Sequence, residues 1–353
     1  MRLDEPPWWY GSAEDMRQRA LLPFSWLYGW VCERRYARHA GYRSRLPVIC
    51  VGNFTAGGTG KTPLSMFIAR LLIARGERPA FLTRGYGGRS RGPQWVKRGP
   101  DAATLYGDEP LLLAAVAPTL VARDRRAGII AMERARQSPS VVIMDDGLQN
   151  PAVAKDLSIA LIDGKRGIGN GEVIPAGPLR APLDFQLQLV DAIIVRDPPA
   201  DSGNKRSVLD VLRRGFPGPV LTANVAAVGD TSWIAGKPLL AFAGIANPRR
   251  FYRLLESLGG RLADVVSFPD HHQFSAADAE RLIAAARQSG AQLVTTEKDH
   301  ARLSGNDAVD RLAAASRVLP IEMQIDDREL VRLNSLLDAA LQGISRRQRP
   351  PPT

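Results

Sequence analysis

A glycine-rich run that ends in Gly-Lys-Thr is the part of the sequence best suited to bind a phosphate. The run is Thr55-Ala56-Gly57-Gly58-Thr59-Gly60-Lys61-Thr62, and it follows the apolar stretch 47–51. Glycines let successive backbone N–H groups surround an anion, and a helix that starts there adds the positive end of its dipole. Lys61 is expected to reach the β- and γ-phosphates of a nucleotide, and the Thr62 hydroxyl to hold Mg²⁺. The run therefore predicts a P-loop, with Thr55 in place of the usual first glycine.

An acidic pair after an apolar run supplies the second half of such a site. Val141-Val142-Ile143-Met144 is typical of a buried strand, and Asp145 and Asp146 follow it directly. An acid at the carboxyl end of a buried strand, downstream of a P-loop, is the expected partner of the metal. Two adjacent acids are unfavourable there unless a cation neutralises them. We therefore predict that Asp145 and Asp146 hold Mg²⁺ together with Thr62.

Three further polar clusters have residue types suited to act on an acceptor or a nucleotide. Gly107-Asp108-Glu109-Pro110 places two carboxylates at a predicted helix start, one suited to act as a base and the other to support the metal. Asp270-His271-His272 sets a histidine beside a carboxylate, which can orient it or share its proton. Thr295-Thr296-Glu297-Lys298-Asp299 follows an apolar run, where α/β sheets bind ligands. Taken singly, each cluster fits a helix cap or a polar loop at least as well.

Alternating apolar runs and helical patterns place these motifs on a sheet. Apolar runs at 80–82, 159–162 and 192–195 suit parallel strands that are covered on both faces. After the P-loop, apolar residues recur at helical spacing from Leu64 to Leu72. The alternation predicts an α/β protein, a P-loop NTPase-like, doubly wound and mostly parallel sheet with a second, smaller α/β domain.

The division into domains follows from a second alternation late in the chain. A strand at 239–243, a helix from about Pro248, a helix capped by Ser275, a strand at 292–295 and a last helix from about 327 to 341 are predicted. We expect a P-loop domain over residues 1–225 with an N-terminal membrane-docking helix, a C-terminal domain over 226–345 and a disordered tail over 346–353.

Composition and charge narrow the class of protein. The chain has 353 residues, 45% of them hydrophobic, and its net charge of +11 favours an anionic partner. The two cysteines are not in a CxxC spacing, so a zinc site or a disulfide framework is not expected. The start does not resemble a signal peptide. The aromatic stretch 21–32 is too short to span a bilayer but, with the basic flank 33–38, suits a membrane interface or a helix packed on the core.

Taken together, the motifs resemble the tetraacyldisaccharide 4′-kinase family of lipid A biosynthesis over roughly residues 15 to 340. The runs that carry the resemblance are VGNFTAGGTGKTP (51–63), TRGYGGR (83–89), GDEP (107–110), DDGLQN (145–150), GNGEVIPAGPLR (169–180), FAGIANPRRF (242–251), FPDHHQF (268–274) and TTEKD (295–299). Thr55 agrees with the family, whose loop carries Ser or Thr there. Three positions depart from the family's usual residues, namely Asn150, Ala181 and His300.

The resemblance implies a lipid kinase that uses ATP and Mg²⁺. It implies transfer of the γ-phosphate of ATP to the 4′-hydroxyl of tetraacyldisaccharide 1-phosphate, giving lipid IVA, at the cytoplasmic face of the bacterial inner membrane. The expected partners are this lipid A precursor and the anionic membrane surface, with no nucleic acid and no obligate protein partner. Closure of the two domains is expected to complete the site and to exclude water.

Residue roles follow from the same resemblance. Asp108 is implied as the base, His271 as its partner and Lys61 as the third catalytic residue. The nucleotide contacts are expected from Thr55, Ala56, Gly57, Gly58, Thr59, Gly60, Lys61, Thr62, Thr296, Glu297, Lys298 and Asp299. The metal ligands are expected to be Thr62, Glu109, Asp145 and Asp146. The substrate contacts are expected from Arg84, Gln149, the asparagine of Gly169-Asn170, Glu172 and Arg180.

A soluble small-molecule kinase is the nearest enzymatic alternative, and the apolar N-terminal segment argues against it. Two functions of other classes use the same P-loop and also stay open at this point. A membrane-associated P-loop ATPase switch without a lipid acceptor needs neither Asp108 nor His271. A nucleic-acid-stimulated ATPase fits the charge, but the sequence lacks an evident aromatic and basic single-strand platform. Transfer of labelled phosphate to a lipid distinguishes the kinase from both.

Overall fold

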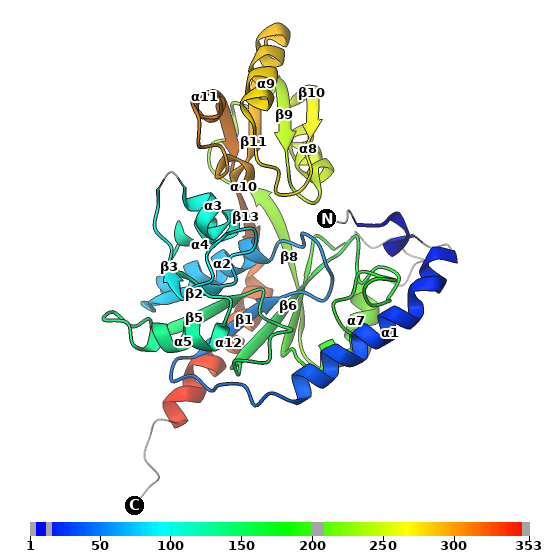
Figure 1. The fold of residues 1–353 in the computed structure, drawn as a ribbon, viewed down its shortest axis with the longest axis vertical. Helices are drawn as coiled ribbons and strands as arrows, with labels where there is room; N and C mark the ends of the chain where they lie inside the picture. Colours follow the sequence, from blue (N-terminus) through cyan, green and yellow to red (C-terminus); the bar gives the residue numbers. More distant parts are fainter. Residues whose placement is uncertain (1–4, 12–15, 100, 199–207, 348–353) are drawn as a thin grey trace, which may run out of the picture.

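The first sheet forms the larger lobe of the protein (Figure 1). The computed structural model describes residues 5–11, 16–99, 101–198 and 208–347. The sheet has nine strands in the order β13-β8-β7-β6-β1-β5-β2-β4-β3. In chain order these are β1 Val48–Gly52, β2 Pro79–Thr83, β3 Gln94–Trp95, β4 Thr119–Val121, β5 Val141–Asp145, β6 Leu157–Asp163, β7 Ala192–Arg196, β8 Val220–Ala227 and β13 Ile321–Gln324. Only the outer pairs, β3 with β4 and β13 with β8, are antiparallel.

Alternate residues of the central strands pack on opposite faces of this sheet. Val48 and Cys50 of β1 belong to one apolar cluster, and Ile49 and Val51 belong to the other. The helices of the larger lobe are α2 Lys61–Ala74, α3 Ala102–Tyr106, α4 Asp108–Ala114, α5 Arg125–Glu133, α6 Leu183–Leu187, α7 Val208–Gly215 and α12 Asp327–Arg347. Both faces of the sheet are therefore covered, and the predicted doubly wound fold is confirmed.

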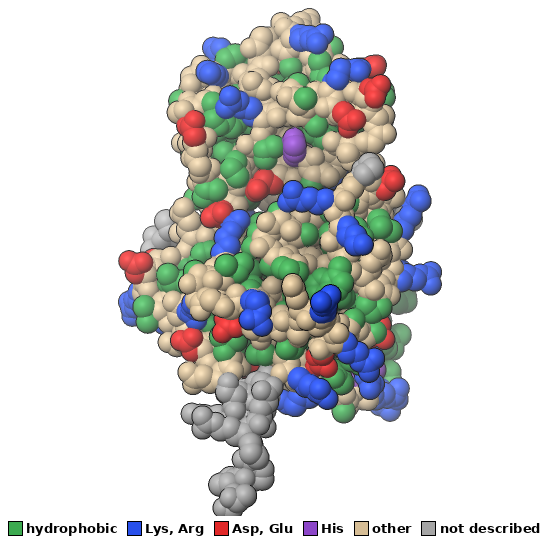
Figure 2. Space-filling model, turned by 90° about the vertical axis from the view of Figure 1, so that its left-hand side faces the viewer, with side chains coloured by type: hydrophobic (Ala, Val, Ile, Leu, Met, Phe, Trp, Pro, Cys, Tyr) green, Lys and Arg blue, Asp and Glu red, His purple; other side chains and the backbone are tan. Residues whose placement is uncertain are grey.

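A parallel four-stranded sheet forms the smaller lobe, in the order β10-β9-β11-β12. Its strands are β9 Pro238–Ala243, β10 Arg261–Ser267, β11 Gln292–Thr296 and β12 Ser316–Leu319, and its helices are α8 Pro248–Ser257, α9 Ala276–Ser289, α10 Glu297–His300 and α11 Asp307–Ala315. The Ser275 side chain caps α9 as predicted, in a capping box with Asp278. Figure 2 shows this lobe above the larger one, with a waist between them.

The chain returns to the larger lobe after the smaller one is complete. Strand β13 pairs with β8, and α12 buries Leu333 and Leu337 in the cluster that also contains Leu64 of α2. This topology differs from the predicted division, which assigned residues 226–345 to one domain. We propose instead that the second domain spans about residues 228–320. Residues 346 and 347 end α12, and the rest of the predicted disordered tail, 348–353, lies outside the described residues.

The predicted aromatic segment lies within a long N-terminal helix, α1 Met16–Ala37. Its Ser25 hydroxyl accepts a hydrogen bond from the Ala176 N–H at 3.0 Å, and Gly29 lies against Pro182. Apolar side chains on other sides of the helix are exposed, including Phe24 at 63%, Trp26 at 68% and Trp30 at 53%. Within the described residues, no helix has the length and apolarity needed to cross a membrane.

Leu333→Ala tests whether α12 belongs to the larger lobe. Leu333 is fully buried, so its truncation should lower the free energy of unfolding by about 2–5 kcal/mol in a urea titration. Val331 lies on the same helix but is 66% exposed, and Val331→Ala should change the unfolding free energy by less than about 0.5 kcal/mol. Equal effects of the two substitutions would contradict the packing of α12 on this sheet.

Candidate active site

The predicted P-loop connects the central strand β1 to helix α2. Gly60 has a φ of 93° and ends the loop, and Lys61 is the first helical residue. Gly57 also has a positive φ, at 95°. These left-handed residues curl the backbone in a way that side chains with a Cβ rarely allow. The segment around Pro178 holds the start of the loop, because the Ala56 N–H donates to the Pro178 carbonyl at 2.7 Å. The geometry fits a phosphate at the start of α2.

The acidic pair lies beside the P-loop because β5 is the neighbour of β1. Asp145 is paired in register with Val51 and is 1% exposed. The Ser65 hydroxyl of α2 donates to Asp145 Oδ1 at 2.7 Å, which fixes the carboxylate toward the N-terminal half of the helix. Burial, followed by the charge of Glu109, raises the pKa of Asp145 to about 7. A divalent cation would relieve this accumulation of negative charge, so the residues present fit Mg²⁺.

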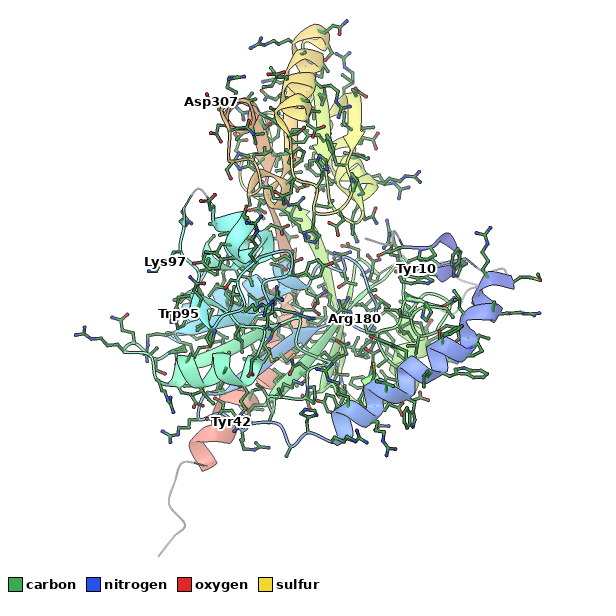
Figure 3. The ribbon with its side chains drawn as sticks, viewed as in Figure 1. Tyr10, Tyr42, Trp95, Lys97, Arg180 and Asp307 are labelled. Carbon is green, nitrogen blue, oxygen red and sulfur yellow. The ribbon has the colours of Figure 1, made fainter. Side chains whose placement is uncertain are left out.

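Asp146 differs from its neighbour because cations surround it. Lys61 Nζ lies 3.8 Å from Asp146 Oδ1, and Arg180 Nη1 donates to the same oxygen at 2.7 Å. Burial acts to raise the pKa of Asp146, but the charges of Lys61 and Arg180 outweigh it and hold that pKa well below its usual range. Figure 3 shows Arg180 near the centre of the view, within the larger lobe. Asp146 therefore keeps both cations at the loop.

A second constellation joins the two lobes around Asp108. Asp108 is the first residue of α4 and is 4% exposed. His271 Nδ1 lies 3.1 Å from Asp108 Oδ1, and Arg302 Nε donates to Asp108 Oδ2 at 3.0 Å. Lys298 Nζ lies 3.2 Å from Glu109 Oε1 and 3.3 Å from His271 Nε2. Three cationic or imidazole groups of the smaller lobe thus converge on two acids of the larger lobe.

These partners determine the protonation state of Asp108. Burial acts to raise its pKa, but the hydrogen bond from His271 and the charges of Lys298 and Arg302 hold that pKa well below its usual range. Asp108 is therefore a carboxylate that accepts hydrogen bonds on both oxygens. The Asp108 carboxylate favours the His271 tautomer with its proton on Nδ1, so the lone pair of the ring lies on Nε2, which faces the Lys298 ammonium at 3.3 Å.

The loop 83–89 also meets this constellation. Gly107 packs so tightly that an added Cβ would lie 2.3 Å from the Tyr86 carbonyl oxygen, and its φ is 87°. Tyr86 is 56% exposed, and its ring lies 5.4 Å from the His271 ring, centroid to centroid. The Arg84 side chain is exposed. Aromatic and basic groups therefore surround the acids at the junction of the lobes.

The predicted nucleotide contacts at 296–299 are mostly used within the smaller lobe. Thr296 caps α10, and its hydroxyl donates to Asp299 Oδ2 at 2.7 Å. Asp299 is fully buried and accepts from the Gly244 N–H, while Glu297 accepts from the Ile321 N–H. Lys298 alone of these four extends to Glu109 and His271. The structure thus brings Lys298 to the site and gives the other three structural contacts, those of Thr296 and Asp299 within the smaller lobe and that of Glu297 to β13 of the larger sheet.

Several predicted substrate contacts also support the backbone. Gln149 donates to the Asn53 carbonyl at 2.8 Å and to Gln186 Oε1. The Asn170 side-chain amide donates to the Ala176 carbonyl, and its oxygen accepts from the backbone N–H of Glu172. Glu172 itself is half-buried. Arg180 donates to the Thr55 carbonyl as well as to Asp146. Among these predicted residues, Arg180 combines a place at the P-loop with partial exposure.

Sequence reasoning missed two residues that hold the acids in place, Ser65 and Arg302, and a buried arginine near them, Arg125. Ser65 lies four residues after Lys61, a helical spacing that was available as a signal. Arg302 follows Asp299 by three residues, but nothing in its surroundings marked it as a partner of Asp108. Arg125 begins α5, is 3% exposed and donates to the Ala122 carbonyl. Burial lowers the pKa of Arg125 to about 10, against the opposing charge of Asp146.

Comparison with known proteins supports the family resemblance over most of the chain. The sequence profile described as tetraacyldisaccharide-1-P 4′-kinase matches residues 17–342. The tetraacyldisaccharide 4′-kinase of Parvibaculum lavamentivorans is 45% identical over 92% of this chain and 94% of that protein. The tetraacyldisaccharide 4′-kinase of Methylobacterium nodulans is 45% identical over 95% of each chain. The crystal structure of LpxK from Aquifex aeolicus in complex with ATP has a TM-score of 0.70, with 26% identity over 92% of this chain and 100% of that chain.

Arg302→Met tests the contact that ties Asp108 to the smaller lobe. The substitution keeps the length of the side chain but leaves two buried carboxylates, Asp108 and Asp299, without their shared cation. We expect a loss of about 3–5 kcal/mol in the free energy of unfolding. Arg311 on α11 is exposed, and Arg311→Met is the matched control, expected to leave thermal and urea unfolding nearly unchanged. Similar effects of both substitutions would show that the ion pairs of Arg302 contribute little to the free energy of unfolding.

Proposed function

This chain belongs to the tetraacyldisaccharide-1-P 4′-kinase family, and from that membership we propose that it transfers the γ-phosphate of ATP to the 4′-hydroxyl of tetraacyldisaccharide 1-phosphate. The product is lipid IVA. The observation that carries the proposal is the placement of His271 and Asp108 at the junction of the two lobes, in a chain that also holds a P-loop with its acidic strand end. A nucleotide switch has no evident use for that histidine–carboxylate pair.

The residues of the larger lobe are suited to hold MgATP. The backbone N–H groups of residues 57–60 and the start of α2 surround the phosphates, and Lys61 and Arg180 supply positive charge beside them. Thr62, Asp145 and Asp146 are the proposed metal ligands, with Glu109 nearby as a fourth. Among the described residues, no three His, Cys, Asp or Glu side chains are grouped as a metal site. Mg²⁺ usually takes one or two carboxylates together with substrate phosphates and neutralises the charge of the transferred group.

The geometry favours His271 over Asp108 as the base. Asp108 is buried and its two oxygens accept from His271 and Arg302, so it has little affinity for a further proton. His271 donates from Nδ1 to Asp108, which holds the ring in place and stabilises it when it becomes protonated. Lys298 Nζ, which lies 3.3 Å from His271 Nε2 in this structure, gives up that position to the 4′-hydroxyl. The hydroxyl proton then passes to Nε2 as its oxygen bonds to the γ-phosphorus and the bond from that phosphorus to ADP breaks. We therefore propose Asp108 as the orienting partner, which reverses the roles that the resemblance implied.

Contact between the lobes completes this site. Asp108 and Glu109 come from α4, whereas His271, Lys298 and Arg302 come from the smaller lobe. Separation of the lobes would move His271 away from the P-loop and from an acceptor hydroxyl bound beside it. Their closure keeps water away from the phosphoryl group, so that the sugar hydroxyl is the nucleophile.

Helix α1 is the proposed membrane-docking element. Its exposed side chains include Phe24, Trp26, Leu27 and Trp30, and the basic residues Arg34, Arg35 and Arg38 that follow are exposed as well. An aromatic, apolar surface with a cationic flank favours an anionic membrane interface. We place the protein at the cytoplasmic face of the bacterial inner membrane on this argument, because a lipid acceptor stays in the bilayer and the enzyme must reach it.

The direct test is phosphate transfer from γ-labelled ATP to tetraacyldisaccharide 1-phosphate in mixed micelles. We expect a labelled lipid product with Mg²⁺ and none with EDTA. Lys61→Ala should reduce turnover to background, because Lys61 is the P-loop cation nearest the transferred phosphate. Lys237 is exposed and directly precedes β9 of the smaller lobe, and Lys237→Ala should retain full turnover. Release of free phosphate without labelled lipid would instead support the membrane-associated ATPase switch.

Substitution of His271 tests the assignment of the base. His271→Gln should lower kcat about 10²- to 10⁴-fold and leave the affinity for MgATP nearly unchanged. His272→Gln is the matched control, because His272 pairs with Asp278 and stacks on Phe268, away from Asp108. Near-normal turnover in His271→Gln, with an inactive Asp108→Asn, would return the role of base to Asp108.

A further inference from the structure

Six charged side chains gather beside the P-loop, on the side away from Asp145. Arg196 ends β7, and its Nη1 would lie 2.3 Å from a Cβ placed on Gly60. Asp163 ends β6, the strand between β7 and β1. Arg250 reaches the cluster from α8 of the smaller lobe. The members are the three arginines Arg166, Arg196 and Arg250 and the three carboxylates Glu5, Asp163 and Asp197. The formal charges of these six side chains sum to zero.

Two of the three carboxylates are fully engaged. Asp163 Oδ2 accepts from Arg196 at 2.6 Å and from Arg250 at 2.8 Å, and its Oδ1 accepts from the Lys165 N–H at 3.0 Å. Asp197 Oδ2 accepts from Arg250, and its Oδ1 accepts from the Val225 N–H at 3.0 Å. Both acids are therefore fixed by main-chain and side-chain donors. Removing either carboxylate from the cluster would leave an arginine without its negatively charged partner.

Glu5 is held differently. Its Oε2 accepts from Arg166 Nη1 at 2.7 Å, while its Oε1 is buried and has no hydrogen-bond partner among the described residues. That free oxygen lies on the P-loop, only 1.8 Å from the position that a Cβ on Gly57 would take. Burial raises the pKa of the Glu5 carboxyl more than the charge of Arg166 lowers it, and Asp270 adds to the rise. Glu5 is the least satisfied anion of the cluster.

Glu5 belongs to a short N-terminal segment, residues 5–10, that is folded onto the larger lobe. The Trp9 indole donates to the Pro175 carbonyl at 3.1 Å, and the Asn170 N–H donates to the Trp9 carbonyl at 2.8 Å. Arg166 lies 4.9 Å from the Tyr10 ring centroid, so the segment contacts that arginine twice. Figure 3 shows Tyr10 on the side of the molecule where the N-terminal helix lies. This segment precedes residues 17–342, which the family profile matches.

We propose that Arg166 is a phosphate-binding residue of the nucleotide site. In the absence of ATP its guanidinium is paired with the Glu5 carboxylate beside Gly57, and ATP displaces that carboxylate. The inference rests on the proposed function only in requiring that the P-loop binds ATP. A phosphate that lies against Gly57 meets the Glu5 carboxylate, and two anions at that spacing repel each other. Arg166 already bonds to the carboxylate that touches Gly57, so a phosphate there offers it a replacement with more charge and more acceptor oxygens.

Binding of MgATP, measured by titration calorimetry without lipid, tests this exchange. Glu5→Gln keeps the shape of the side chain and removes its charge, so ATP should bind about 2- to 5-fold more tightly. Arg166→Gln should weaken ATP binding roughly 10-fold. In the double variant the gain from Glu5→Gln should be smaller than in the single variant, because only the direct repulsion between Glu5 and the phosphate is then relieved. Arg166→Lys keeps the charge and should bind ATP within a few-fold of the unmodified protein, which excludes misfolding as the cause of the loss.

Glu280→Gln is the matched control, because Glu280 is an exposed acid on α9 of the smaller lobe. It should leave ATP affinity unchanged. Equal or weaker ATP binding by Glu5→Gln, or additive effects of the two substitutions, would overturn the inference while leaving the kinase assignment intact. Failure of the unmodified protein to bind MgATP would overturn both.

Discussion

The buried carboxylate of Asp108 imposes the condition that the rest of the site must meet. A carboxylate that is 4% exposed is stable only with cations or donors around it, and here all the partners with which it shares ion pairs come from the smaller lobe. Arg302, His271 and Lys298 lie on different loops and helices of that lobe. The ion pairs of Asp108 therefore help to hold the two lobes together, and they position the histidine at the same time.

Much of this arrangement follows from sequence patterns that are local. The P-loop, the acidic strand end and the capping box at Ser275 each depend on residues a few positions apart, so their types and spacing predict them. The buried strands were predictable as well, because strands covered on both faces are continuous apolar runs. The fold class and the family could be predicted from these features together, and both are confirmed.

Features that depend on residues far apart in the chain were not predictable in the same way. Nothing local indicates that β13 pairs with β8 across nearly a hundred residues, or that Arg302 satisfies Asp108. A polar residue in a motif can either stabilise the local backbone or contact the site, and the spacing of the residues does not distinguish these two roles. Thr296 and Asp299 stabilise the start of α10, whereas Lys298 between them reaches the other lobe. The direction of a side chain from a helix turn decides this, and only the packed structure supplies it.

The cations around the phosphate site have internal carboxylate partners in this structure. Lys61 and Arg180 share Asp146, Lys298 faces Glu109, and Arg166 holds Glu5. Such pairs keep the cations in place and limit their mutual repulsion. Because each of these pairs is partly exposed, breaking it costs little, whereas the buried pairs Arg196–Asp163 and Arg302–Asp108 are expensive to break. The difference in burial thus separates the charges that a triphosphate can recruit from those that must stay fixed to preserve the lobes.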